Sequence, residues 1–508
     1  MSVELELQPR ERLHPMSWLF AVIAFGRQFI VPLIAAALFG SREGEPIWLA
    51  TVLVPMILAA VWKQYFYRYG FAADALVIRE GLFFHNIRRI DYARIENVDT
   101  ERGILHRLLG VAEVKVETST GGKPEALIQV LSLAAADALR RQVFARRSEE
   151  VEPQQSTQPS APELHLPPSE VIKFGLIDNR GMVVVAGLFG LLYETGLLEA
   201  WSVSLRERLN LQTFDQIVAG DWLIQAGVVL ATLLAVLIVL RVFSVVLALL
   251  TLYDFTLARA AGDLKVRYGL LTRLSLTLRL SRIQAVHRTE TLLHRLFDRV
   301  SLRVDLAGGT RGQGEQNQDA AKSVRWLAPV VEPARGDELI ALALPDVRFA
   351  TPPQWQPLAP GAHKRVFRMS AFFWSFAGVA LAAITREYYP LALVAIGLPI
   401  SWWHARMYVR YTGWALQEDA LFVRMGWLTR TLAVVPRNRI QTAQWAESPF
   451  DRRHAMASVT VDTAGAGSRS DVVRIDYLER DVAVELAREL YTSVAHDEPA
   501  RHAERVLT

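Results

Sequence analysis

The sequence contains no cysteine, and this absence removes several kinds of chemistry from consideration. Without a thiol, the chain forms no disulfide and has no thiolate nucleophile. Zinc sites and iron–sulfur clusters that depend on cysteine ligands are excluded for the same reason. Any metal or catalytic site would have to be built from other residue types.

Motifs for catalysis and nucleotide binding are also missing. The sequence has no Gly-x-Ser-x-Gly and no His-Glu-x-x-His, which mark hydrolases and zinc enzymes. The glycine-rich run 308–314 lacks the closing Gly-Lys-Ser/Thr of a phosphate loop, so we interpret it as an insertion between strands. His287 and His294 are seven positions apart, which would place them on one helix face, but they match no metal-binding spacing. We therefore expect no catalytic residue, no metal site, no cofactor and no enzymatic activity.

Charge of one sign is not in large excess either. The formal net charge is +4 for 508 residues. This value is too small to indicate a nucleic-acid partner, and no zinc-finger or RNA-binding signature accompanies it. We therefore expect no nucleic acid among the partners of this chain.

Apolar residues, in contrast, are abundant and are gathered in long blocks. They make up 51% of the chain and the mean hydropathy is +0.19, so the membrane class is indicated. The blocks form three pairs, each joined by a polar loop, at 16–62, 182–253 and 369–404. A pair of apolar segments with a polar connection predicts a transmembrane helical hairpin. The three pairs together predict six transmembrane helices.

Two of these blocks allow a second interpretation or need an extension. The first could be a secretory signal peptide, because Ala35-Ala36-Ala37 resembles a cleavage site. It exceeds the roughly 7–15 residues of a signal core and a second block follows at once, so a hairpin is favoured. The run Trp222–Tyr253 is too long for one simple crossing. We expect Arg241 near the interface, where its side chain reaches lipid headgroups, and a helix that continues towards the next domain.

A threefold repeat organises the rest of the chain. The pattern Leu-x-[Ile/Val]-Arg-x-Gly occurs at 76–81, 264–269 and 421–426. Thirteen positions after each glycine comes an Arg-Ile-[Glu/Gln] triplet, and thirteen further on comes another arginine. Three copies with the same spacing indicate an internal repeat, so each glycine should occupy an equivalent turn and each triplet an equivalent strand end. The residues are Gly81, Gly269 and Gly426, then Arg94, Arg282 and Arg439, then Arg107, Arg295 and Arg452.

Each copy has the pattern of a small mixed domain. Short stretches in which apolar and polar residues alternate predict half-buried strands, as at Val114–Val116, Leu302–Val304 and Val459–Val461. An amphipathic stretch at the end of each copy predicts a closing helix. The expected fold class is an α+β membrane protein, in which a transmembrane hairpin precedes a small β-barrel or sandwich capped by a helix, three times over. The expected domains are 64–147, 254–344 and 405–495, with a flexible linker at 148–168 and a Pro-rich linker at 345–361.

These motifs resemble those of the YdbT type of bacterial membrane protein, which is built from bacterial pleckstrin-homology-like (PH-like) domains. The resemblance depends on the two repeated motifs and on the hairpin before each domain, and it covers most of the chain. The first copy matches best, with Leu108-Leu109-Gly110 where the second has Leu296-Phe297-Asp298 and the third has Arg453-His454-Ala455. The resemblance implies a PH-like fold and a membrane location with the domains in the cytoplasm. It implies no catalytic chemistry.

The candidate site residues are arginines of the repeat and two ionisable residues inside apolar blocks. Arginine makes planar, bidentate contacts with phosphate and carboxylate, so the repeated arginines could form equivalent contacts to a partner or a lipid headgroup. The alternative is structural, because exposed arginines also pair with acids or cover apolar surface. An ionisable residue at membrane depth is costly to bury and indicates either a pathway or a structural polar contact. The candidates are Arg79, Arg267, Arg424, Arg94, Arg282 and Arg439, and within the membrane blocks Arg27 and Glu194.

The expected function is that of a polytopic membrane scaffold. Its three PH-like domains would bind membrane lipids or a protein partner, expected to be a smaller PH-like membrane protein of the same family, in envelope maintenance or stress. The alternative is a transporter or lipid-handling channel that uses the helices around Arg27 and Glu194. Parity places both termini and all three domains on one face of the membrane. Lysine and arginine are denser next to the domains than in the opposite loops, which favours the cytoplasmic side of a bacterial inner membrane.

Overall fold

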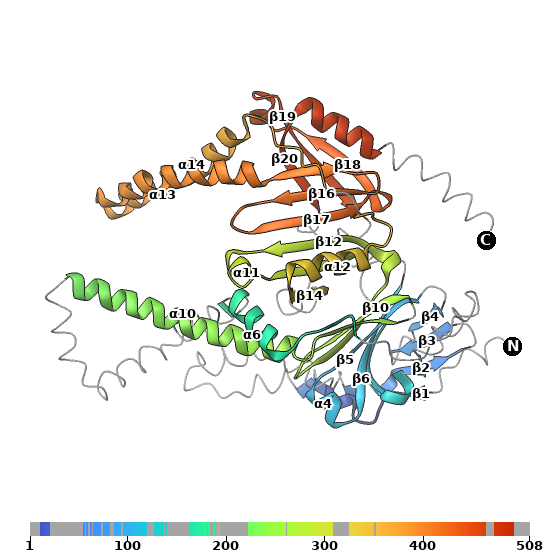
Figure 1. Cartoon of the computed structure of the whole chain (residues 1–508). Coiled ribbons are helices and arrows are strands. Elements are labelled where there is room, and N and C mark those ends of the chain that lie inside the picture. Colours follow the sequence, from blue (N-terminus) through green and yellow to red (C-terminus); the bar gives the residue numbers. More distant parts are fainter. Residues whose placement is uncertain are drawn as a thin grey trace. The chain divides into compact units, whose positions relative to one another are not determined.

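The computed structural model of the chain describes most of the residues outside the first membrane block (Figure 1). The described residues are 11–20, 67–72, 75–81, 86–92, 95–118, 126–139 without 137, 162–179, 222–260, 262–307, 325–349, 352–463 and 472–491, with isolated residues between 54 and 66 and between 181 and 193. The first hairpin and the first arm of the second lie almost entirely outside them. The chain divides into two compact units. The first comprises Met1–Ser119, Pro124–Ala258 and Lys265–Thr277, and the second comprises Thr120–Lys123, Arg259–Leu264 and Leu278–Thr508.

The first repeat folds as two small antiparallel sheets with helical turns between 133 and 139. Its strands are β1 (Glu11–Arg12), β2 (Arg68–Phe71), β3 (Ala75–Glu80), β4 (Asn86–Asp91), β5 (Ile95–Arg102), β6 (Val111–Thr118) and β7 (Ala126–Ser132), with helix α4 (Ile104–Leu108) after β5. The first sheet has the order β1-β2-β3-β4. Alternate residues of both sheets, such as Ile78 of β3 and Val114 of β6, share one core with Leu139. This period of two matches the predicted half-buried strands and gives a sandwich with a closing helix.

The second repeat contributes strands to both units. The elements that lie wholly or partly in the first unit are β8 (Leu164–His165), α6 (Pro168–Ile177), α10 (Trp222–Leu252), β9 (Thr256–Ala260), β10 (Asp263–Tyr268) and β11 (Arg273–Leu278). Those that follow in the chain are η2 (Leu280–Arg282), β12 (Ile283–Glu290), α11 (Leu292–Leu296), β13 (Val300–Leu306), β14 (Trp326–Val331) and α12 (Pro333–Ala343). Every residue of β14 is buried, and α12 packs on β12, β13 and β14. This helix is the closing helix that the sequence predicted for the second copy.

The third repeat is described almost completely. Its elements are α13 (Ala362–Thr385), η3 (Tyr389–Leu391), α14 (Ala392–Tyr411), β15 (Gly413–Leu416), β16 (Ala420–Met425), β17 (Arg430–Pro436), η4 (Arg437–Arg439), β18 (Ile440–Ala446), α15 (Pro449–Arg452), β19 (Met456–Thr463), β20 (Val473–Glu479) and a helix over 480–491. Val423 of β16, Val459 of β19 and Leu486 of the last helix meet in one core. The first and third repeats therefore have the same two-sheet, one-helix plan.

Sheets pass from one repeat into the next, which the sequence did not predict. The seven-stranded sheet has the order β7-β6-β5-β11-β10-β9-β8, so β5 of the first repeat pairs with β11 of the second. The six-stranded sheet has the order β14-β13-β12-β17-β16-β15, so β12 of the second repeat pairs with β17 of the third. Each pairing covers the edge of two small sheets at once, and edges left open expose unpaired backbone groups. The repeats are therefore joined in series by backbone hydrogen bonds.

A short segment before each hairpin returns to the sheet that follows it. Glu11 of β1 lies opposite Tyr69 of β2, and Leu164 of β8 lies opposite Leu257 of β9. In the third repeat, Gln356 forms an isolated bridge with Trp414 of β15. The chain on either side of each hairpin is therefore held in one place.

Both linkers are more ordered than the sequence indicated. The last residues of the segment 148–168 form β8 and the start of α6, so this part is no flexible tether. In the Pro-rich segment 345–361, Leu358 and Ala359 are buried, and Leu358 belongs to the core of the third repeat. Proline composition predicted an extended chain, but apolar residues between the prolines dock it against the domain.

The membrane helices agree with the prediction only in part. Within the described residues, two helices are long and apolar enough to cross a membrane, Leu223–Leu252 and Ala362–Thr385. Six transmembrane helices were predicted, but most of the first hairpin lies outside the described residues. Helix α14 packs along α13 (Figure 1), as the predicted third hairpin requires. It does not qualify as a third span, because aromatic, basic and other polar residues from Trp402 to Tyr411 shorten its apolar part.

Helix α10 continues past Arg241 to Leu252, as expected. The guanidinium of Arg241 has partners inside the chain, and its contact with headgroups stays a prediction. It donates to the carbonyl of Leu176 at 2.9 Å and to the side chain of Asn179 at 2.9 Å. These contacts satisfy the end of α6, whose last carbonyls have no partner within the helix. Arg241 therefore fixes α6 against α10.

The predicted equivalence of the glycine turns is confirmed. Gly81, Gly269 and Gly426 follow β3, β10 and β16 directly and have φ values of 106°, 113° and 77°. Residues with a side chain rarely adopt this backbone conformation. Arg282 and Arg439 are likewise equivalent, because each ends a short 3-10 helix immediately before a strand. Arg94 lies outside the described residues.

We predict that Gly269→Ala destabilises the protein and that Gly227→Ala does not. A Cβ at position 269 would lie 2.0 Å from the carbonyl oxygen of Thr272, in addition to the unfavourable φ. Such strain costs about 1–3 kcal/mol. A Cβ at Gly227, in the second turn of α10, meets nothing within 4 Å. Thermal unfolding of the purified protein in detergent measures both effects, and equal midpoints for the two variants would contradict the assignment of this turn.

Candidate functional site

The repeated arginines lie in three separate domains. Arg79, Arg267 and Arg424 occupy the same position of β3, β10 and β16, two residues before the turn glycine. Arg267 is exposed and Arg79 is half-buried. The guanidinium carbon of Arg424 lies 4.4 Å from the ring centre of Trp355, an arrangement typical of a cation–π contact. Burial lowers the pKa of Arg424.

The second set of arginines ties strand ends together. Arg282 donates from its side chain to the carbonyl of Ala307, and the Ala307 amide donates back to the Arg282 carbonyl at 2.9 Å. These bonds join the start of β12 to the end of β13. Arg439 lies 3.8 Å from the carboxylate of Asp346. Both positions therefore have structural partners inside the chain.

Two further candidates and one arginine lie outside the described residues. These are Arg27 and Glu194 of the membrane blocks and Arg94 of the first repeat. Their contacts have no structural description, so the interpretation of Arg27 and Glu194 as part of a pathway stays a prediction. Among the residues that are described, no group of three or more histidines and acids could hold a metal ion.

His287 and His294 do not share a helix face, so this prediction was wrong. His287 lies in β12 and its Nε2 is 2.7 Å from the carboxylate of Asp305. His294 lies in α11, where the Thr291 amide donates to its Nδ1 at 3.2 Å and its Nε2 is 2.8 Å from the Ser301 hydroxyl. Strand β12 ends between the two histidines. Residues seven positions apart lie on the same face only when both belong to one helix.

The structure brings together a basic cluster that sequence reasoning did not select. A cavity of about 610 Å³ lies where the start of α13 meets the turn after α15 and the end of β20. Lys364, Arg365 and Arg368 line it from the first turns of α13, and His454 and Arg480 line it from the domain. Glu479 and Asp481 are the acids of its lining. The cavity thus joins a membrane helix to a PH-like sheet and has an excess of cationic groups.

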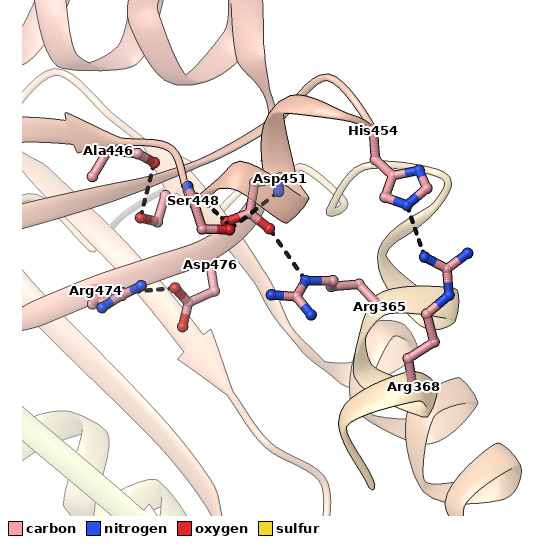
Figure 2. A network of polar contacts seen from close by, with 9 residues as sticks. Arg365, Arg368, Ala446, Ser448, Asp451, His454, Arg474 and Asp476 are labelled. Atoms are coloured by element: carbon pink, nitrogen blue, oxygen red, sulfur yellow. Dashed lines mark hydrogen bonds and ion pairs between the residues drawn. The ribbon is translucent and has the colours of Figure 1, made fainter. Parts of the chain in front are cut away.

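A polar network fixes one side of this cavity (Figure 2). Arg365 points at Asp451, with 3.3 Å between Nε and the carboxylate oxygen, and Ser448 donates its backbone amide to the same carboxylate at 3.1 Å. Arg368 points at His454, with 2.9 Å between the guanidinium nitrogen and Nε2. Burial alone would raise the pKa of Asp451, but hydrogen bonds from Ser448 and Arg365 outweigh it and hold that pKa below its usual range.

The two cavity arginines of α13 therefore differ in what they can do. Arg365 is committed to an ion pair in which both side chains are about four-fifths buried, at 20% and 18% exposure. Lys364 and Arg368 are both exposed on the first turns of α13. Cationic side chains beside the amides of a helix N-terminus can bind phosphate or carboxylate. The sequence signal for this site was the basic cluster directly before the apolar run that starts at Met369.

Comparison with known proteins agrees with the threefold repeat. The profile of a family described as "Bacterial PH domain" matches residues 20–147, 212–331 and 371–494. Each match includes apolar membrane-block residues as well as the domain that follows. One repeat therefore consists of a membrane segment together with the domain after it. The chain is also similar to the UPF0699 transmembrane protein YdbT of Bacillus subtilis (strain 168). The two are 21% identical over 492 residues, which cover 93% of this chain and 96% of that protein.

We predict that His294 makes the second repeat sensitive to acid. Burial lowers its pKa from 6.5 to about 4; Glu290 opposes this shift and Arg303 adds to it. Between these values the unfolded chain binds a proton that the folded domain excludes, so the free energy of unfolding falls as the pH decreases from 6.5 to 4. Thermal unfolding at pH 7.5 and pH 5 should show a smaller acid-induced decrease for His294→Asn than for the natural chain. The control is the exposed His363→Asn, and an unchanged decrease in His294→Asn would contradict the prediction.

Proposed function

Because the chain belongs to the bacterial PH domain family, we propose that it is a multi-pass membrane scaffold whose cytoplasmic PH-like domains bind anionic lipid headgroups at the membrane surface. The single observation that supports headgroup binding most directly is the basic cavity at the start of α13. The proposal includes no enzymatic step and no nucleic acid.

The position of the cavity along α13 supports this choice of ligand. The cationic side chains lie in the first two turns of the helix, and large exposed apolar side chains begin immediately afterwards with Met369, Phe372 and Phe373. A helix that crosses a bilayer changes from polar to apolar surface at the headgroup level. Lys364 and Arg368 would then face lipid phosphates, where each basic residue contributes about 1 kcal/mol.

The location in the membrane follows from three supporting observations. The similar Bacillus protein is named as a transmembrane protein, and two described helices are candidate spans. The strand pairings before and after each hairpin hold its two ends together, which favours an even number of crossings per repeat. We propose six helices in the bacterial inner membrane with all domains in the cytoplasm, because basic residues are denser on the domain side.

The scaffold role also includes a protein partner. The partner expected from the family resemblance is a smaller PH-like membrane protein, in a process of envelope maintenance or stress. A small domain with an exposed sheet edge can bind a partner by adding a strand at that edge. The alternative of a transporter depends on Arg27 and Glu194, and no observation on the described residues favours it.

Reporter fusions should reveal the orientation. A reporter active only in the cytoplasm should work after Thr508 and within 148–161, because both lie on the domain side of the hairpins. An export-dependent reporter should work only within 199–221, the loop of the second hairpin. The activity of each reporter enzyme is measured in intact cells. The reverse pattern would place the domains outside the cytoplasm.

Removing two cavity cations should weaken the binding of anionic lipid. We predict that Lys364→Gln/Arg368→Gln lowers the affinity for phosphatidylglycerol by about tenfold or more, because two phosphate contacts are lost. Native mass spectrometry of the purified full-length protein, titrated with short-chain phosphatidylglycerol or phosphatidylcholine, measures the bound lipid. Arg365 is left unchanged because its pair with Asp451 supports the fold.

The matched control removes the same number of positive charges from other positions of the third repeat. Arg348→Gln/Arg488→Gln removes two exposed cations that do not line the cavity, and it should bind phosphatidylglycerol as the natural chain does. Equal binding of the two lipids by the natural chain, or equal losses in both double variants, would contradict headgroup binding at this cavity.

A further inference from the structure

Among the sheet edges in the described part of the chain, two lack a partner strand that their counterparts in other repeats have. The sheet of the first repeat ends at β4, and the sheet of the third repeat, β18-β19-β20, begins at β18. The equivalent edges elsewhere are all paired, because β5 joins β11 and β12 joins β17. The strand β4 occupies the repeat position of β11 and β17, and β18 occupies that of β5 and β12. The chain therefore has one open edge of each kind.

The two internal junctions have the same register. In the first, Arg273 lies opposite Arg102, and in the second, Arg430 lies opposite Glu290. Arg273 and Arg430 both come four positions after their turn glycine, and Arg102 and Glu290 both come eight positions after the Arg of their triplet. A register repeated between different residue pairs indicates that the geometry of the fold, rather than one side-chain contact, specifies the junction.

An arginine from the preceding repeat secures each junction. Arg107, in α4 after β5, donates to the carbonyl of Leu270 at 3.0 Å. Arg295, in α11 after β12, donates to the carbonyl of Leu428 at 2.9 Å. Leu270 directly follows Gly269 and Leu428 lies two positions after Gly426, so both carbonyls belong to the turn at the repeat glycine of the next domain. The third arginine of this set, Arg452 in α15, is exposed, and its side chain has no hydrogen-bonding partner among the described residues.

The open edges expose apolar side chains that are covered at the paired edges. In β12 the first four residues are buried, whereas in β18 only Ile440 is buried and Trp445 is 45% exposed. In β4 the first four residues are exposed, including Ile87 at 54%. Natural proteins usually protect an edge strand against further pairing, so an edge with an exposed tryptophan indicates an interface.

We propose that β18 of one copy pairs with β4 of a second copy of this chain, which deepens the proposed scaffold function by adding self-association to the binding of a smaller PH-like protein. At the register of the internal junctions, Trp445 lies opposite Ile87 and Gln444 lies opposite Arg88 of the second copy. An aromatic residue opposite a β-branched residue is a favourable cross-strand pair. Arg452 then lies beside the second copy, in the repeat position from which Arg107 and Arg295 bind the next domain.

The number and order of strands identify the second copy as the occupant. Joining three strands of the last sheet to four of the first gives the order β20-β19-β18-β4-β3-β2-β1. This order has the same repeat positions as β7-β6-β5-β11-β10-β9-β8, the seven-stranded sheet within one chain. The pairing is head-to-tail, so it extends to a third copy or closes as a ring in the plane of the membrane. The proposal rests on the scaffold function and is independent of lipid binding at the basic cavity.

Cysteine crosslinking tests the register directly, because the natural chain has no cysteine. Two differently tagged full-length chains are co-expressed, one with Gln444→Cys and the other with Arg88→Cys, and isolated membranes are oxidised. Opposite residues of an antiparallel pair have Cα atoms about 4.5–5.5 Å apart, within the range of a disulfide. We expect a crosslinked species that contains both tags. The matched control replaces Gln444→Cys with Arg474→Cys on β20, two strands further from the edge, and should give none.

A disruptive variant separates docking from folding. Trp445→Lys/Arg452→Ala changes two exposed side chains, so its thermal unfolding should match that of the natural chain. It should weaken self-association in detergent by about tenfold or more, because a cross-strand pair and a charged hydrogen bond are lost. The lipid variant Lys364→Gln/Arg368→Gln should crosslink at the natural level, which keeps a failure of headgroup binding distinct from a failure of this proposal.

Three results would overturn the proposal. One is no crosslink between tags although both thiols react with a maleimide. Another is an equally strong crosslink in the Arg474→Cys control, which would show proximity without register. The third is a crosslink from position 444 only to a different PH-like protein.

Discussion

The need to pair the backbone groups at sheet edges is the constraint on which this structure depends. Each repeat supplies two small sheets, and a small sheet has two edges with unpaired amides and carbonyls. The chain pairs β5 with β11 and β12 with β17, so an edge from one repeat covers an edge from the next. The repeats are thus joined by the same backbone hydrogen bonds that build each sheet, and side chains such as Arg107 and Arg295 add to each junction.

The membrane helices are connected to this arrangement by equally local contacts. A strand or bridge before each hairpin pairs with the first strand after it, and Arg241 fixes α6 against α10. Because the anchors and the sheets share backbone contacts, the start of α13 and the turn after α15 meet at a fixed place. The basic cavity is a consequence of that meeting.

Local sequence patterns predicted the repeated units, but they did not predict which strands pair between repeats. The period of two predicted strands such as β6 and β19, and the repeated glycines predicted turns at positive φ. The pairing of β5 with β11 joins residues that are far apart in sequence, and nothing in either strand alone specifies it. The strands β1 and β8 have two residues each, too few for an alternating pattern. The cavity was missed because its basic residues come from the start of α13, the turn after α15 and the end of β20, which are far apart in sequence. The arginines selected from the sequence were chosen by their repeated spacing.

The central claim is that consecutive repeats are joined edge to edge at one register. An intramolecular disulfide between Thr100→Cys and Ser275→Cys tests it most directly, since these residues lie opposite each other in β5 and β11. We expect this bond to form within single chains in oxidised membranes, independently of protein concentration. The comparison is Thr100→Cys with Thr277→Cys, which is displaced by two residues along β11. Efficient bonding in the displaced pair and none in the first would contradict the account.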